Sequence, residues 1–154
     1  MTVSFERTTR VRAPIDRVFE LALSIDAHLD SMSGHHERAI AGVTSGRIGL
    51  GEDVTWRARH LGIRWTMTSR IVELDRPTFF ADEQVRGPFA RYRHEHSFTV
   101  VDGGSQVVDR VSFVAPYGPL GLLIEPLLLW YVRRLIDRRN VFLTKAAEQE
   151  LGSE

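Results

Sequence analysis

Residues 79–98 read FFADEQVRGPFARYRHEHSF, and this stretch predicts a β-hairpin. Two strand-like runs flank the segment 87–89, Gly-Pro-Phe. Glycine is free in φ and the proline ring fixes φ, a combination that is typical of a turn, here one of three residues. Side chains alternate between the two faces of a strand, so one face of the second run carries both aromatic rings. We assign this face to the interior. It comprises Tyr92, His94, His96 and Phe98.

A three-residue turn also fixes which residues lie opposite one another in the hairpin. The predicted facing pairs are Phe80 with His96, Asp82 with His94, Gln84 with Tyr92 and, on the outer face, Glu83 with Arg93. The inner face therefore mixes aromatic and polar side chains. Buried polar groups need hydrogen-bond partners or water, and clusters of them usually line a cavity.

The composition fits one domain, which we place at residues 1–150, followed by a short disordered tail at 151–154. The chain has 154 residues, of which 43% are hydrophobic and 26% are charged. Basic and acidic residues number 20 each, and this balance argues against nucleic-acid binding. The absence of cysteine excludes disulfides and thiolate chemistry. Residues 1–12 lack the apolar run of a signal peptide, which indicates a cytoplasmic protein.

The rest of the chain predicts one strand, two short helices, several antiparallel strands and a long helix. Pro14 opens the first helix, since proline is tolerated in a first helical turn. His35 and His36 follow a break after the second helix, and we expect them in a solvated loop. The predicted ranges are 3–12 for the first strand, 15–22 and 25–31 for the helices, 54–59 and 65–75 for the next strands, and 117–149 for the final helix.

The sequence Asp-Gly-Gly-Ser at 102–105 predicts a second tight turn. With Gly103 and Gly104 at its centre, Asp109 points inward on a diagonal from His96. The facing pairs in this register are Asp109 with Phe98, Val111 with His96, and Phe113 with His94.

The final helix is apolar on several sides. At 100° per residue, one stripe comprises Ile124, Leu128, Tyr131, Leu135, Phe142 and Ala146, and Pro126 is expected to kink the helix or to begin a new one. Further stripes contain Leu122, Leu129, Ile136 and Leu143, and Leu123, Trp130 and Val141. Such a helix needs more cover than one sheet supplies, so we expect a homodimer through this region. Membrane contact is the alternative, because arginines stand at 133, 134, 138 and 139.

This order of elements resembles the helix-grip fold of the START-like (SRPBCC) superfamily, which contains pollen allergens, lipid-transfer domains and aromatase/cyclases. The segments 80–89 and 94–98 are similar to the bacterial polyketide cyclase/dehydrase and lipid-transport branch, and 51–56 and 109–119 fit the same branch. The resemblance implies an α+β fold in which a curved antiparallel sheet wraps around the long C-terminal helix. A cavity between the two would bind a hydrophobic small molecule, either a lipid or a polyketide-like aromatic compound.

The ligand-binding residues expected on this basis are Trp56, Trp65, Met67, Phe80, Asp82, Gln84, Tyr92, Phe98, Phe113, Tyr131 and Leu135. The alternative is a polyketide cyclase/dehydrase-type enzyme in which His94, His96 and Asp109 act as acid and base. The two histidines also have a spacing that suits a metal ion, with Asp82 or Asp109 as third ligand. The resemblance brings no metal, so we expect neither a metal nor another cofactor.

Overall fold

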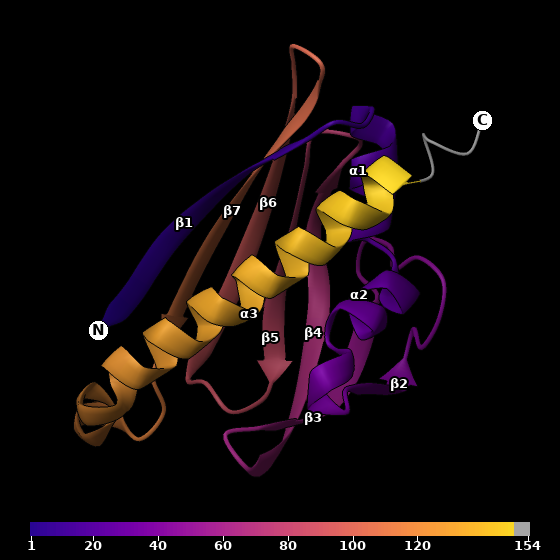
Figure 1. Ribbon diagram of the computed structural model, residues 1–154. Helices are drawn as coiled ribbons and strands as arrows, with labels where there is room; N and C mark the ends of the chain where they lie inside the picture. Colours follow the sequence, from indigo (N-terminus) through magenta and orange to yellow (C-terminus); the bar gives the residue numbers. More distant parts are fainter. Residues whose placement is uncertain (150–154) are drawn as a thin grey trace.

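A computed structural model describes residues 1–149, in which seven strands form one curved antiparallel sheet and a long helix crosses one face of it (Figure 1). The strand order is β1-β7-β6-β5-β4-β3-β2. The strands are β1 (Thr2–Val11), β2 (Arg38–Gly42), β3 (Asp53–His60), β4 (Ile63–Asp75), β5 (Phe79–Arg86), β6 (Arg91–Val101) and β7 (Gly104–Val114). The helices are α1 (Ile15–Ala22), α2 (Ile25–Ser31) and α3 (Gly121–Gln149), with single 3-10 turns η1 (Ser33–His35) and η2 (Gly118–Leu120). The predicted fold class is confirmed, while the predicted tail at 151–154 lies outside the described residues.

The two short helices form where the sequence predicts them and cover one end of the sheet (Figure 1). Pro14 is the N-cap of α1, which buries Val18 and Phe19. In α2 the N-cap is Ser24, whose hydroxyl accepts a hydrogen bond from the backbone N–H of Ala27 at 3.1 Å. Phe19 makes edge-to-face contacts with two rings of the sheet. These contacts fix α1 against β5 and β6.

The register predicted for the first hairpin is correct through its central pairs, which join Phe80 to His96, Asp82 to His94 and Glu83 to Arg93. The expected pair of Gln84 and Tyr92 is not formed, because the ladder ends at Glu83 and Arg93. The Gln84 amide instead bonds both backbone polar groups of Phe89 and closes the loop.

The register predicted for the second hairpin is wrong by two residues. The turn is centred on Asp102 and Gly103, with Gly103 at φ +80°, and Val101 pairs with Gly104. The two-residue Asp-Gly loop is a favoured hairpin turn, and it shifts every predicted partner by two positions. The observed pairs are Tyr92 with Phe113, His94 with Val111, His96 with Asp109, and Phe98 with Val107. A shift of two keeps each side chain on its predicted face but moves Asp109 directly opposite His96.

The long helix begins at Gly121 rather than at Tyr117, and it continues through Pro126, so no second helix begins there. None of the helices within residues 1–149 is both long and apolar enough to cross a membrane.

The face of α3 that packs against the sheet differs from the predicted stripe. Ile136 and Leu143, which the projection turns away from the sheet, are buried, whereas Tyr131 and Leu135 are half-buried at the edge of the contact. Arg139, one of the four arginines that suggested a membrane surface, is also buried. The projection follows apolar residues only, and the sheet-facing stripe contains two polar side chains. The buried side chains of α3 belong to Leu128, Val132, Ile136, Arg139, Asn140, Leu143 and Ala147.

Candidate ligand-binding cavity

A cavity of about 220 Å³ lies between the sheet, α2 and α3. Most of the residues expected from the sequence line it. Those that do are Trp56, Trp65, Met67, Phe80, Asp82, Tyr92, His94, His96, Tyr131 and Leu135. The wall is largely apolar and combines aromatic with aliphatic side chains, and its polar side chains fall into separate clusters.

Four of the expected residues do not line this cavity. Phe98 and Phe113 are each 1% exposed and pack in the two hydrophobic clusters of the core. Gln84 holds the loop between β5 and β6 through Phe89. Asp109 is fully buried behind the two histidines, so it acts on the cavity through them.

Asp109 organises the polar groups beneath the cavity wall. Its Oδ1 accepts a hydrogen bond from His94 Nε2 at 2.7 Å, and its Oδ2 accepts one from the Asn140 amide at 2.8 Å. Arg139 Nη1 lies 3.7 Å from Oδ1. Burial raises the pKa of Asp109, but the hydrogen bond from His94 and the close approach of His96 oppose this and hold it well below the usual value. Asp109 is therefore an ionised carboxylate that ties β7 to β6 and α3.

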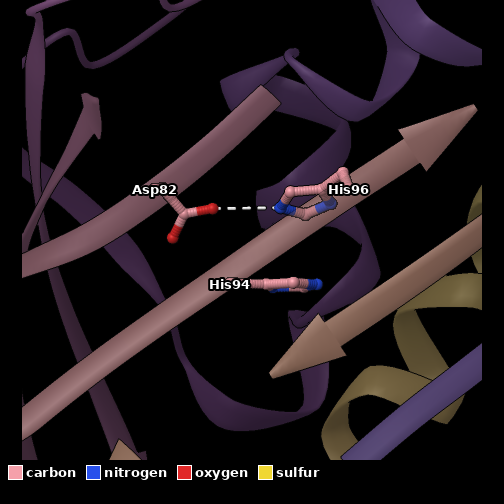
Figure 2. A group of neighbouring side chains, drawn as sticks. All are labelled: Asp82, His94 and His96. Atoms are coloured by element: carbon pink, nitrogen blue, oxygen red, sulfur yellow. Dashed lines mark hydrogen bonds and ion pairs between the residues drawn. The ribbon is translucent and has the colours of Figure 1, made fainter. Parts of the chain in front are cut away.

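The second histidine interacts with the opposite strand. Figure 2 shows Asp82 on β5 beside His96 on β6, and His96 Nε2 lies 3.0 Å from Asp82 Oδ2. A carboxylate only accepts hydrogen bonds, so the imidazole donates from Nε2. His96 Nδ1 lies 3.2 Å from Asp109 Oδ1 but lacks the alignment of a hydrogen bond. The ring of His96 is stacked between those of Phe80 and His94, with centroids 4.0 and 3.7 Å away.

The two histidine–carboxylate contacts cross the direct strand pairing. Asp82 pairs with His94 in the ladder but bonds His96, while Asp109 pairs with His96 but bonds His94. Each imidazole therefore leans diagonally across β6 toward a different neighbouring strand. The result is a chain of polar contacts that joins β5, β6, β7 and α3.

The protonation states suit acid–base chemistry. Burial, together with the neighbouring His96, lowers the pKa of His94 to about 4, because the hydrogen bond to Asp109 compensates only in part. His94 is therefore neutral at neutral pH. Burial raises the pKa of Asp82, but the hydrogen bond from His96 and the nearby His94 and Arg139 bring it below the usual value. The wall thus presents an ionised carboxylate next to a neutral imidazole.

The same three side chains have the composition of a metal site. Asp82, His94 and His96 each offer one ligand atom, and these atoms all lie within 4.8 Å of one another. The Nε2 atoms of both rings already hydrogen-bond to carboxylates, that of His94 to Asp109 and that of His96 to Asp82. The hydrogen bonds alone therefore explain this arrangement.

A second polar cluster, not predicted from the sequence, lies where η1, the β3–β4 turn and α3 meet. His60 Nδ1 is 2.8 Å from the Tyr131 hydroxyl, the rings of His35 and His60 have centroids 4.9 Å apart, and Arg138 Nη1 is 3.3 Å from His35 Nε2. Burial lowers the pKa of both histidines. His36 is exposed, as predicted, whereas His35 is half-buried because its ring packs against His60 and Tyr131.

A third pair, also absent from the sequence-based prediction, lies beside Trp56. His28 Nε2 contacts Glu37 Oε1 at 2.5 Å, and the rings of His28 and Trp56 have centroids 4.2 Å apart. His28, Glu37, His60 and Tyr131 all line the cavity. Of the residues that sequence reasoning missed, only Asn140 left a usable signal, because it falls three and four positions from the apolar residues Leu143 and Ile136.

Solved structures with the same architecture are numerous. The Zhui aromatase/cyclase from Streptomyces sp. R1128 superposes with a TM-score of 0.81 at 20% identity, over 98% of this chain and 96% of that one. The protein TTHA0849 from Thermus thermophilus gives 0.72 at 19% identity, over 96% of this chain and 100% of that one. The di-domain ARO/CYC BexL from the BE-7585A biosynthetic pathway gives 0.75 at 17% identity, over 96% of this chain and 50% of that one. At these identities the likeness shows the fold alone, which is the helix-grip fold.

No curated protein sequence matches the chain significantly. A family model described as polyketide cyclase / dehydrase and lipid transport matches residues 2–148. That match covers the sheet, the cavity-lining residues and nearly all of α3. The chain therefore belongs to the polyketide cyclase/dehydrase and lipid transport family.

Proposed function

We propose that the protein binds a hydrophobic small molecule of aromatic, polyketide-like character in the cavity between the sheet and α3. The observation that carries the proposal is the cavity itself, about 220 Å³ with a largely apolar wall that includes Trp56, Trp65 and Phe80. An apolar cavity of about 150 Å³ holds one benzene ring. The space therefore suits a compound of roughly two rings, or one end of a longer molecule such as a lipid.

The wall supplies a few polar groups that would orient such a ligand. Asp82, Tyr92, His94 and His96 lie close together on β5 and β6. Further polar side chains of the wall are those of His28, Glu37, His60 and Arg139, and most of the other lining side chains are apolar. A binding protein needs no more than this, because the apolar wall contributes affinity and the polar groups fix the orientation.

Catalysis of a cyclisation or dehydration is the second candidate, and the histidine–carboxylate contacts favour it. In this version neutral His94, oriented by Asp109, removes a proton from the substrate, and His96, held by Asp82, returns one. An enzyme and a carrier would use the same residues. They differ in what the histidines must do.

Native mass spectrometry of protein purified without denaturation tests the binding proposal first, since a bound hydrophobe would add its mass. His96→Ala then separates the two candidates. In a carrier it should weaken binding by about one hydrogen bond, roughly 0.5–1.5 kcal/mol. In an enzyme it should lower turnover by about 10²–10⁴-fold with little loss of binding. If no hydrophobe binds, and replacing His94 with Leu and His96 with Phe together raises stability, the proposed site is wrong.

The proposal includes self-association through the start of α3. Leu123 and Trp130 are 81% and 54% exposed, although both are large and apolar. A second copy of the chain would cover them. Contact with a membrane surface is the alternative, and the guanidinium of Arg134, 5.7 Å from the centroid of the Trp130 ring, supports it.

A further inference from the structure

The charged side chains that line the cavity are unevenly balanced. Within residues 1–149 they are two carboxylates, Glu37 and Asp82, and one guanidinium, Arg139. Arg139 lies 3.7 Å from the buried carboxylate of Asp109, and its other contact is with the backbone oxygen of Ala22 at 3.5 Å. The positive charge of Arg139 is therefore offset before any ligand enters. Among the described residues, the wall has no further cation apart from what its histidines carry.

One carboxylate oxygen faces the cavity without a partner. Asp82 Oδ2 is bonded to His96, whereas Asp82 Oδ1 has no hydrogen bond within the described part of the chain. The Asp82 side chain is 20% accessible, so a ligand can reach this oxygen. An ionised oxygen in an apolar cavity is stabilised by a hydrogen-bond donor or a cation and destabilised by another anion.

We propose that the ligand is a neutral or cationic aromatic compound that donates a hydrogen bond from a hydroxyl or ammonium group to Asp82, and that the cavity rejects carboxylic acids. The inference rests on the proposed binding function and gives it a ligand class. Two features favour a donor. Asp82 offers a free acceptor, and the pKa of Asp82, lowered by His96 and Arg139 against the effect of burial, keeps it ionised.

The aromatic wall strengthens the case for a donor over an acid. Trp56, Trp65 and Tyr131 line the same cavity as the two carboxylates. Aromatic faces attract cations and are indifferent or unfavourable to anions. A ligand carboxylate would meet Asp82, because the second carboxylate of the wall, Glu37, is bonded to His28 and the one guanidinium of the described wall is already offset by Asp109. A phenol or an ammonium would instead find a hydrogen-bond acceptor in Asp82 and aromatic rings around it.

The experiment compares matched naphthalene probes at pH 7.5, followed by quenching of Trp56 and Trp65 fluorescence in a Trp130→Phe background. The probes are naphthalene, 2-naphthol, 2-naphthylmethylammonium and 2-naphthoate. Wild-type binding of the naphthol and the ammonium should be about 10- to 100-fold tighter than that of naphthoate, the range expected for a hydrogen bond to a charged group. In Asp82→Asn the ratio of naphthol or ammonium affinity to naphthoate affinity should fall by about 10-fold, and naphthoate should bind more tightly than it binds the wild type. A 10-fold change in affinity corresponds to about 1.4 kcal/mol. The amide keeps the shape but loses the charge.

Asp137→Asn is the matched control, because it removes a carboxylate on the exposed face of α3, where it pairs with Arg7 at 2.8 Å. It should leave the probe ranking unchanged. Equal binding of all four probes to the wild type, or tighter binding of naphthoate, overturns the inference and leaves the binding function standing. If none of the probes binds, both fail. The wild-type ranking decides the matter even if Asp82→Asn does not fold.

Discussion

Replacing Asn140 with leucine should lower the free energy of unfolding by about 1.5–3 kcal/mol, the range for a hydrogen bond to a charged group. The side chains have similar size, so packing changes little. The Asn140 amide donates to Asp109 Oδ2 at 2.8 Å, and Asp109 is fully buried. Leucine removes the donor that the described part of α3 supplies to that oxygen. The remaining partners, His94 and Arg139, lie against the other oxygen and do not replace the amide.

Urea denaturation of the two proteins measures the effect. With a slope of roughly 2 kcal/mol per molar urea, the midpoint should fall by about 1 M. Thr144→Val, one turn further along α3, is the matched control. Its hydroxyl oxygen is buried with no hydrogen-bond partner within the described residues, so its removal should leave stability unchanged or raise it. Equal midpoints for Asn140→Leu and wild type would refute the view that Asp109 depends on the helix.

Three further outcomes follow from the structure. The pKa of His94 is about 4, below its value near 6.5 in the unfolded chain, so the unfolded chain takes up the proton first as pH falls. The free energy of unfolding should therefore fall by at most about 3 kcal/mol as pH drops from about 6.5 to 4. Urea titrations at several pH values should show a flatter pH dependence for His94→Gln than for wild type. Gly104→Ala should destabilise strongly or prevent folding, judged by circular dichroism, because its Cβ would lie 2.1 Å from the backbone oxygen of Val11; normal stability would contradict the tight approach of β1. Trp130→Ser should weaken self-association in sedimentation at high concentration, whereas a wild-type monomer that binds no vesicles would remove the basis for that proposal.

The hairpin at 79–98 and its inward face could be predicted because alternation of side chains is a local property. Phe80, Asp82, His94 and His96 lie where the alternation places them. The register of the next hairpin could not be fixed in the same way, because two turn centres, Asp102 with Gly103 or Gly103 with Gly104, differ by one residue in the loop. A two-residue error in register leaves each side chain on the correct face of the sheet, but it gives each residue the wrong partner on the neighbouring strand.

The polar residues that α3 contributes could not be read from the apolar stripe that the projection favours, although the spacing of Asn140 from Ile136 and Leu143 hints at them. Arg139 and Asn140 are polar, so a projection that maximises hydrophobicity turns them outward, yet both are buried beneath the sheet. Their burial is explained by Asp109, which comes from a strand about 30 positions earlier. Only the three-dimensional pairing of β7 with α3 makes that polar stripe favourable. The cluster of His35 and His60 likewise joins segments with no shared pattern.

The hydrogen bond between Asn140 and Asp109 also affects how large a ligand the cavity accepts. The cavity lies between the sheet and α3, so an outward shift of the helix is one way to admit a molecule larger than the present space. That movement withdraws the amide from the carboxylate, and it adds about 1.5–3 kcal/mol to the work of widening the cavity. Size discrimination in this protein would then be steeper than an apolar wall alone produces, and Asn140→Leu should broaden the range of molecules admitted.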